Sequence, residues 1–281
     1  MKFAIICLMP LFFLKTNAQV RMNLFTQSGY VWQFPTDSID SLNFSLNTNN
    51  SLLNIHTHNG NIVQHPLNLI DSINHRFGFY SVGNGISDSE GNHYNSIILN
   101  NGQEWTTENL RTSIYSNGDS ILNLIDSMSW ENSTVGLWCY YNNDVQFNIP
   151  YGKLYNWYTA ADVRNACPIG WHVASNWDWQ LLTNYLGTIN LGGLMKSTDS
   201  TYWQSPNLNA TNESGFSGLP GGTRSGTSNN FYYLGQTGIW WSSTQATTLT
   251  GWYRLLSFNS NNLHGNCFNK NLGLSIRCVK D

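Results

Sequence analysis

The middle of the chain, residues 151–187, has apolar residues at helical spacing on both sides of a break. Steps of three and four predict one helix face formed by Leu154, Trp157, Tyr158 and Ala161. Residues 167–172 then end the helix, because proline lacks an N–H and glycine accepts turn angles. Ser175 and Asp178 have the spacing of a capping box, which predicts a second helix that ends at Gly187. Its apolar face is expected to consist of Trp177, Leu181, Leu182 and Tyr185.

Residues 22–44 and 53–75 form an internal repeat that aligns without gaps, with Gly29 matching Gly60 and Pro35 matching Pro66. Each copy predicts a strand, a glycine turn, a strand, a proline break and a short third strand. Two such copies bury little area alone, so residues 19–78 are predicted to form one small β domain with approximate internal symmetry. Its shared buried face is expected to contain Leu24, Val31, Ile39, Ile55, Ile62 and Ile70.

Two groups of polar residues raise a metal hypothesis. The second repeat has three histidines where the first has Phe25, Gln27 and Phe34, so exposed strand histidines are favoured for His56, His58 and His65. Asp88 and Glu90 precede Gly91, but their spacing is not that of a calcium loop, and a hairpin turn is favoured. No cofactor is therefore expected, with a structural calcium ion as the alternative.

The rest of the chain alternates strand signals with long polar segments. Residues 239–243, 252–258 and 274–279 are predicted strands, and the last should place Leu274, Ile276 and Cys278 on one face. Residues 192–238 are rich in glycine, serine and asparagine, with scattered aromatic side chains. A loop region of this length inside a compact domain is usually functional or held by its own packing.

Composition narrows the class of protein. The chain has 281 residues, 41% of them hydrophobic, which is enough for one large and one small domain. Only 10% are charged and the net charge is −3, without a basic run. This balance argues against nucleic acid or an anionic membrane surface as a partner.

Residues 1–18 have the pattern of a signal peptide. Lys2 precedes an apolar run over residues 3–14, and Ala18 ends a small-residue cleavage site, so the mature chain is expected to begin at Gln19. The run is too short to span a membrane, and no later segment has the pattern of a span. We expect export, with a secreted, periplasmic or cell-surface location. Four cysteines then remain, and an even number in an exported chain favours disulfides: Cys139, Cys167, Cys267 and Cys278.

Several motifs occur in a fixed order along the second part of the chain. They are Asp88-x-Glu90-Gly91-Asn92-x-Tyr94, Gln103-x-Trp105-x-x-Glu108-Asn109-Leu110, Tyr151-Gly152-x-Leu154-Tyr155-x-Trp157, Cys167-Pro168-x-Gly170-Trp171-His172-Val173, Gly215-Phe216-Ser217-x-Leu219-Pro220-Gly221-Gly222, Trp240-Trp241-Ser242-Ser243-Thr244 and Ser275-Ile276-Arg277-Cys278-Val279. Together, residues 86–281 resemble the Fibrobacter succinogenes major paralogous domain, a family of exported bacterial proteins. The repeats resemble segments that are often found ahead of such domains.

The resemblance implies a fold but no established activity. The implied fold is α+β, a C-type-lectin-like irregular domain with two helices and a small antiparallel sheet, here preceded by the all-β repeat domain. The family pattern has one cysteine at the turn between the helices and one in the last strand, which implies a Cys167–Cys278 disulfide. Cys139 and Cys267 are then the second candidate pair.

An enzymatic function has two sources of support. One is His172 beside Cys167 and Asp178, although a structural disulfide is favoured for that cysteine. The other is the implied kinship with the formylglycine-generating, sulfatase-modifying enzymes, which bind copper through two cysteines near the C-terminus. Here Cys267 stands alone before Cys278. A non-enzymatic module is favoured, and the alternatives are a divergent enzyme of that kind and a purely structural surface protein.

Aromatic side chains among asparagines favour a binding module for a glycan or a surface protein, since sugar faces stack on aromatic rings and amides pair with hydroxyls. The partner itself is unknown. The Glu-Pro-Asn and Trp-Asn-Asp signatures of calcium-dependent lectins are absent from the sequence. Recognition is expected in the loops of residues 192–238. One concavity there is predicted to be lined by Trp203, Asn207, Asn212, Glu213, Arg224 and Tyr232, with Asn212 and Glu213 either contacting the ligand or capping the loop.

Overall fold

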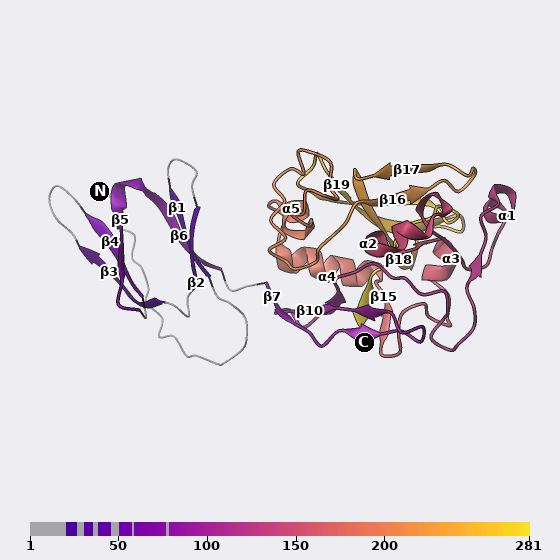
Figure 1. The fold of residues 1–281 in the computed structure, drawn as a ribbon, viewed down its shortest axis with the longest axis horizontal. Coiled ribbons are helices and arrows are strands. Elements are labelled where there is room, and N and C mark those ends of the chain that lie inside the picture. The colour runs from indigo at the N-terminus through magenta and orange to yellow at the C-terminus, as the bar shows by residue number, and fades with distance from the viewer. Residues whose placement is uncertain (1–20, 27–30, 36–38, 46–50, 58, 77–78) are drawn as a thin grey trace. The chain divides into compact units, whose positions relative to one another are not determined.

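The computed structural model describes residues 21–26, 31–35, 39–45, 51–57, 59–76 and 79–281. It divides the chain into two compact units, Met1–Phe77 and Gly78–Asp281 (Figure 1), called here unit 1 and unit 2. The expected signal peptide and the start of the mature chain lie outside the described residues.

Unit 1 contains two three-stranded antiparallel sheets, ordered β2-β1-β6 and β3-β4-β5. Each sheet combines the hairpin of one repeat with the third strand of the other. One short 3₁₀ helix, η2 (Leu67–Leu69), precedes the last strand. The strands are β1 (Arg21–Thr26), β2 (Val31–Pro35), β3 (Ile39–Ser45), β4 (Leu52–Thr57), β5 (Ile62–Pro66) and β6 (Ile70–Arg76).

The described part of the unit 1 core lies on the sheet that contains β4. Leu53 and Ile55 are fully buried, and the apolar residues packed against them are Ile39, Leu42, Val63 and Leu67. The expectation for Ile62 is wrong, because Val63 lies opposite Ile55 and alternation turns the 55% exposed Ile62 to solvent. The side chains of the other expected residues, Leu24, Val31 and Ile70, lie outside the described residues.

The two described histidines of the second repeat are less exposed than the sequence predicts. His56 and His65 are half-buried, and His65 lies opposite buried Leu53, where burial lowers the pKa of its ring. His58 lies outside the described residues.

Unit 2 is a mixed α+β structure of several small sheets. Its largest sheet has the order β15-β21-β11-β10-β7, so strands from both ends of the unit share it (Figure 1). The strands are β7 (Tyr80–Val82), β8 (Ile86–Ser87), β9 (His93–Tyr94), β10 (Ser96–Leu99), β11 (Glu104–Thr106), β12 (Leu122–Asn123), β13 (Leu137–Cys139), β14 (Leu154–Tyr155), β15 (Trp171–Val173), β16 (Gly221–Arg224), β17 (Phe231–Leu234), β18 (Thr237–Gln245), β19 (Thr250–Ser257), β20 (Leu263–Asn269) and β21 (Cys278–Lys280).

The helices of unit 2 are short, and α4 alone among the described ones exceeds two turns. The α-helices are α1 (Ser127–Glu131), α2 (Asn148–Tyr151), α3 (Trp157–Ala160), α4 (Asn176–Leu186) and α5 (Leu191–Met195), and the 3₁₀ helices are η3 (Tyr141–Asn143) and η4 (Val145–Phe147). A fold built from such short elements leaves much of its backbone in loops.

The first predicted helix is largely wrong. Leu154 and Tyr155 form strand β14 against β13, and only the single turn of α3 is helical. Asn156 caps that turn by accepting a hydrogen bond from the Thr159 N–H, and the backbone of Tyr155 pairs with Leu274. These contacts stop the helical spacing from continuing backwards into residues 151–155.

The second predicted helix is confirmed as α4. Ser175 and Asp178 form the capping box, and Gly187 occupies the C-cap with a φ of 80°. The predicted apolar face is wrong at Trp177, which is 67% exposed, whereas Trp179 is fully buried. Trp179 packs on Trp105 with ring centroids 4.9 Å apart, and this pairing fixes the rotation of the helix.

The last part of the chain alternates as predicted. Leu274, Ile276 and Cys278 pack in one buried cluster, whereas Val279 belongs to another. Regular strand structure is shorter than predicted, because only β21 is a strand there and Leu274 and Ser275 make isolated bridges.

Buried cations satisfy the loop carbonyls of unit 2. Lys196 is fully buried, and its Nζ donates to the carbonyls of Leu208, Ser257 and Ser260 at 2.9–3.0 Å. Burial lowers the pKa of Lys196 to about 8. A buried carbonyl without a partner is costly, so these cations stabilise loops that no strand can pair. The buried Lys and Arg residues among those described are Lys153, Lys196, Arg224, Arg254, Lys270 and Arg277.

Candidate functional site

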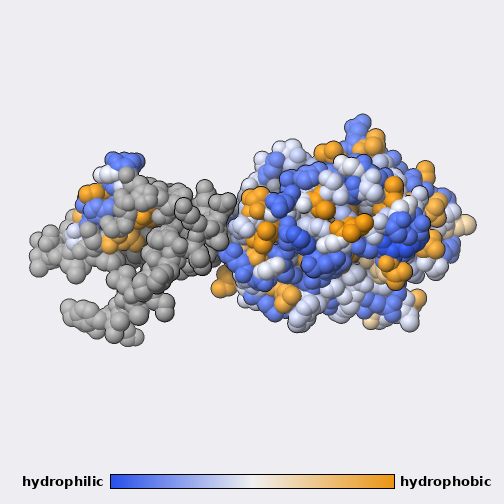
Figure 2. Space-filling model, turned by 90° about the horizontal axis from the view of Figure 1, so that it is seen from below, coloured by the Kyte–Doolittle hydropathy of each residue, from blue (hydrophilic) through white to orange (hydrophobic). Residues whose placement is uncertain are grey.

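A pocket of about 310 Å³ opens in the loop region between α5 and β16. The lining is formed by uncharged residues, namely Thr198, Ser200, Trp203, Ser205, Pro206, Asn207 and Ala210. Lys196 is close to this wall, since its Nζ lies 5.7 Å from the Trp203 ring centroid. The pocket therefore offers hydroxyls, an amide and an aromatic edge to a ligand, and no formal charge. Figure 2 shows one face of unit 2, on which apolar and hydrophilic residues alternate in small patches.

Asn207 is the pocket residue with unused hydrogen-bonding capacity. Its Nδ2 donates to the Ser197 carbonyl at 2.9 Å, which fixes the orientation of the side chain. Its Oδ1 is buried and has no partner. The backbone of Asn207 has a φ of 41°, which asparagine tolerates better than most residues. An amide held in this way can accept one hydrogen bond from a ligand hydroxyl at little entropic cost.

Trp203 lines the same pocket but is mainly a core residue. It is 3% exposed, and its indole N–H donates to the Gly218 carbonyl at 2.9 Å. The structure thus places Trp203 and Asn207 at the same pocket, and little of the Trp203 ring is available to a ligand.

Asn212 holds its own loop closed. Its Oδ1 accepts from the Ser217 N–H at 2.8 Å, its Nδ2 donates to Ser217 Oγ, and its φ is 51°. These contacts match the alternative in which Asn212 caps its loop. Its neighbour Glu213 is half-buried, and neither residue lines the pocket described above.

Arg224 and Tyr232 lie on the β16–β17 hairpin, away from the pocket lining. Arg224 is fully buried, donates to the carbonyls of Leu124 and Ile125, and stacks on Trp130 at 4.0 Å. The guanidinium therefore stabilises the interior. Tyr232 is 44% exposed, and its hydroxyl accepts from Asn230.

Sequence reasoning missed Thr198 and Ser200 as lining residues. The signal available for them was the short run of hydroxyl side chains in residues 197–201, which precedes Trp203. Spacing alone does not bring that run against residues 205–210, because a chain reversal separates them.

The motif residues form a buried polar network centred on Arg277. Its guanidinium donates to Asn109 Oδ1 and to the carbonyls of Thr106, Phe216 and Ser217. Asn109 Oδ1 also accepts from the Trp240 indole N–H at 2.8 Å. Burial lowers the pKa of Arg277 to about 9, which still leaves it charged at neutral pH. Residues from four separate motifs thus meet inside unit 2, where hydrogen bonds join them.

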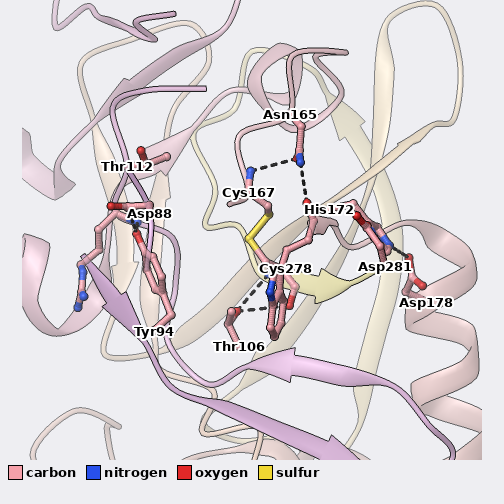
Figure 3. Close-up of a disulfide and its surroundings, with 12 residues drawn as sticks. Asp88, Tyr94, Thr106, Thr112, Asn165, Cys167, His172, Asp178, Cys278 and Asp281 are labelled. Atoms are coloured by element: carbon pink, nitrogen blue, oxygen red, sulfur yellow. Dashed lines mark hydrogen bonds and ion pairs between the residues drawn. A yellow bond between two sulfur atoms is a disulfide. The ribbon is translucent and has the colours of Figure 1, made fainter. Parts of the chain in front are cut away.

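One disulfide joins the turn before β15 to the last strand (Figure 3). Cys167 and Cys278 are bonded, with Cα atoms 5.9 Å apart and a sequence separation of 111, so the predicted bridge is confirmed. The second candidate pair is wrong, because Cys139 and Cys267 are both free. Cys139 is fully buried in the cluster around Trp130, and burial raises its pKa to about 11, whereas Cys267 lies on the outer strand β20.

His172 lies between two carboxylates beside this disulfide (Figure 3). Its Nε2 is 3.1 Å from Asp178 Oδ2, and its Nδ1 is 2.7 Å from Asp281 Oδ1. Asp178 Oδ2 also accepts from the Ser175 N–H and hydroxyl as part of the capping box. A carboxylate only accepts, so both contacts together require the imidazolium form. The hydrogen bond to Asp178, followed by that to Asp281, raises the pKa of His172 against the opposing effect of burial.

We expect this cluster to make unit 2 less stable as the pH rises above 6.5, the ordinary pKa of histidine. A histidine whose pKa is raised in the folded state contributes its full stabilisation below its unfolded pKa. That contribution is lost as the pH rises through the folded pKa. Asp178, with a lowered pKa, adds stability above its ordinary value of 3.8. Denaturant unfolding of His172→Gln should lack the loss at high pH.

The matched control for this prediction is His264→Gln, a histidine hydrogen-bonded to Ser260 Oγ. It should keep the wild-type pH dependence. If the free energy of unfolding of His172→Gln kept the wild-type dependence on pH, the prediction would be contradicted. An equal loss of that dependence in both variants would contradict it as well.

No metal site is built by the described residues. No group of three or more His, Cys, Asp or Glu side chains that could hold a metal ion occurs among them. Asp88 instead closes the predicted turn, with Oδ1 accepting from the N–H groups of Glu90 and Asn92 and Oδ2 accepting from the Tyr94 hydroxyl. Among the same residues, no helix is long and apolar enough to cross a membrane.

Comparison with known proteins places the chain in a family. No curated protein and no solved structure matches it. The model of the Fibrobacter succinogenes major domain matches residues 98–280, more than half of the 281 residues. This range contains the buried network, the disulfide and the loop pocket. The chain belongs to the Fibrobacter succinogenes major domain family.

Proposed function

We propose that this protein is an exported, non-enzymatic binding module whose loop pocket takes an uncharged, hydroxyl-rich ligand such as a glycan. The observation that carries the proposal is the lining of the pocket. Hydroxyls, one oriented amide with an unpartnered Oδ1 and the edge of Trp203 suit a polar ligand without charge. An anionic or cationic ligand would meet no countercharge from the lining residues.

The disulfide supports export. Cys167 and Cys278 are bonded inside a buried cluster, and such bonds persist in oxidising compartments. Together with the signal-peptide pattern of residues 1–18, this favours a secreted, periplasmic or cell-surface location. The location also fits a ligand that is abundant outside cells.

The arrangement of the sheets supports a C-type-lectin-like fold for unit 2. A fold of that kind brings its first and last strands together. Here β7, β10 and β11 from the start of the unit share one sheet with β21 from its end. The pocket lies in the long loops and not in this sheet, as expected when recognition is delegated to loops.

The positions of the cysteines weigh against the enzyme alternative. The sulfatase-modifying enzymes named above need two free thiols close together, whereas Cys278 is bonded to Cys167 and Cys267 has no cysteine partner. Cys139 is a poor nucleophile, because burial raises the pKa of its thiol to about 11.

A glycan array probed with the mature chain tests the proposal. We expect binding to a defined set of neutral oligosaccharides, unaffected by a calcium chelator. Binding only to sulfated or sialylated glycans would contradict the uncharged lining. Absence of binding across the array would instead favour a purely structural surface protein.

A further inference from the structure

The two repeats of unit 1 exchange their third strands. β3 belongs to the first repeat but pairs with β4 of the second, and β6 of the second repeat pairs with β1 of the first. The registers are equivalent, since Asn43 lies opposite Asn54 in one sheet and Asn74 lies opposite Asn23 in the other. In both third strands, the pairing register passes over the aspartate of the shared Ile-Asp-Ser motif. The exchange is therefore the same in both directions.

The chain before each third strand is too short to return that strand to the free edge of its own first strand, β1 or β4. β2 ends at Pro35 and β3 begins at Ile39, which leaves three residues between them, and β5 and β6 are separated by the three residues of η2. A third strand that is antiparallel to β1 runs parallel to β2. Parallel strands in one sheet need a connection of about a dozen residues.

The distances lead to the same conclusion. In the sheet that contains β1, Pro35 lies opposite Arg21, whereas Ile70, the first residue of β6, pairs with Thr26 at the other end of β1. These positions are five residues apart along the strand, or about 17 Å at ~3.4 Å per residue. The four Cα steps from Pro35 to Ile39 reach at most about 14 Å. A repeat therefore cannot place its third strand against its own first strand.

We propose that each repeat is a strand-exchange module, in which the edge of the hairpin's first strand accepts a third strand only from another repeat, and that a second copy of this chain supplies the strand when the neighbouring repeat does not. Main-chain hydrogen bonds along the edge of β1 or β4 provide the binding energy. In the complete chain both exchanges are satisfied internally.

The two third strands have apolar residues at equivalent positions of the register. Leu42 of β3 lies opposite buried Ile55, and Ile73 of β6 occupies the equivalent place opposite Leu24. Asn54 is held by hydrogen bonds with Ser45 and Gln64 on either side, which helps to fix the register. A hairpin formed by β4 and β5 can therefore accept β6 of a second chain in place of β3.

Deletion of one repeat from the otherwise complete chain tests the proposal. Removing residues 22–52 deletes one full period and joins Arg21 to Leu53, which leaves one hairpin with β6. We expect this variant to be a dimer by light scattering and sedimentation, with the β6 amides protected from hydrogen exchange. The complete chain is the reference.

The matched control restores the missing length of chain. An insert of about twelve glycine and serine residues between Pro66 and Leu67 allows β6 to return to its own hairpin. The one-repeat chain with this insert should be monomeric with the same protected amides. A dimer in spite of the insert would show that connection length does not cause the exchange.

A cross-link identifies the strands that meet in the dimer. In the complete chain His56 lies opposite Ser41, and Ser72 lies opposite Phe25. His56→Cys with Ser72→Cys should therefore form a covalent dimer in the one-repeat chain and none in the complete chain. A one-repeat chain that is monomeric, whether its β6 amides are protected or not, would overturn the proposal, as would a dimer that fails to cross-link. The Cys167–Cys278 bond reports that unit 2 is intact in each variant.

Discussion

Replacing Cys167 and Cys278 together by alanine should lower the free energy of unfolding of unit 2 by about 4.7 kcal/mol, the chain-entropy value for a loop of about 100 residues. The bond spans 111 positions and ties the last strand to the turn before β15. Both cysteines are buried in the cluster that contains Trp171 and Ile276, so strand β21 should loosen as well. Denaturant unfolding followed by tryptophan fluorescence measures the change.

The control for the disulfide variant is Cys267→Ser, which removes a half-buried thiol that makes no bond. A change within about 0.5 kcal/mol is expected there, as for substitutions away from special features. If the two variants were equally stable, or if the alanine pair cost less than about 1 kcal/mol, the bond would contribute far less than loop closure predicts.

Replacing Arg277 by methionine is the second large expected effect, with a loss of about 3–5 kcal/mol, the range for removing one partner of a buried charged group. The substitution keeps the length of the side chain but leaves Asn109 Oδ1 and three main-chain carbonyls short of a donor. It also removes the contact of the guanidinium with Phe216, whose ring centroid lies 4.4 Å away.

Two further variants test whether the loss of stability in Arg277→Met comes from the hydrogen bonds of the buried guanidinium. Arg277→Lys keeps the charge but cannot reproduce the planar fork that reaches four acceptors, so it should recover only part of the lost stability. Arg164→Met removes an arginine that pairs with Asp119 and Asp162 at the surface, and a small change is expected. A large loss in Arg164→Met, or none in Arg277→Met, would contradict the role assigned to the buried network.

Local signals in the sequence predicted the parts of the fold that depend on neighbouring residues. The capping box of Ser175 and Asp178 needs only three residues of spacing, and it is present as predicted. The alternation that places Leu274 and Ile276 on one face is also a property of the backbone itself. The disulfide came from the family pattern, which encodes a long-range contact that spacing cannot show.

Tertiary packing decided the positions where sequence reasoning failed. Trp177 and Trp179 are equally good candidates for an apolar helix face, and the packing of Trp179 against Trp105 selects one of them. Leu154 has helical spacing to Trp157 and Tyr158 but is drawn into a strand by β13. Trp105 and β13 are not adjacent in the sequence to the residues that they contact. Periodicity alone therefore could not identify the buried tryptophan or the strand.

Charge misled the prediction of the site. Arg224 is one of few charged residues in residues 192–238, which made it a candidate ligand contact. In a protein with short strands and long loops, buried cations donate to the carbonyls that lack strand partners, and Arg224 does this for Leu124 and Ile125. The predicted residues Trp203 and Asn207 do share the pocket, because they are close in sequence and on the same loop.

The strand exchange is a further feature that the sequence alone did not predict. The repeat alignment shows that both copies are alike, but it does not say which copies pair. The three-residue connection between β2 and β3 contained part of the answer, since it is too short to return a third strand to the edge of β1.

The loop pocket, and not the buried motif network, is the surface that we propose for ligand binding. Ser200→Trp fills the pocket from an exposed position, and Thr134→Trp adds the same side chain at an exposed position outside the pocket lining. The deciding measurement is calorimetric titration of both variants with the oligosaccharide that binds most strongly on the array. We expect at least a tenfold loss of affinity in Ser200→Trp, about 1.4 kcal/mol, with an unchanged Tm and normal affinity in Thr134→Trp. Equal affinity in the two variants would contradict the account.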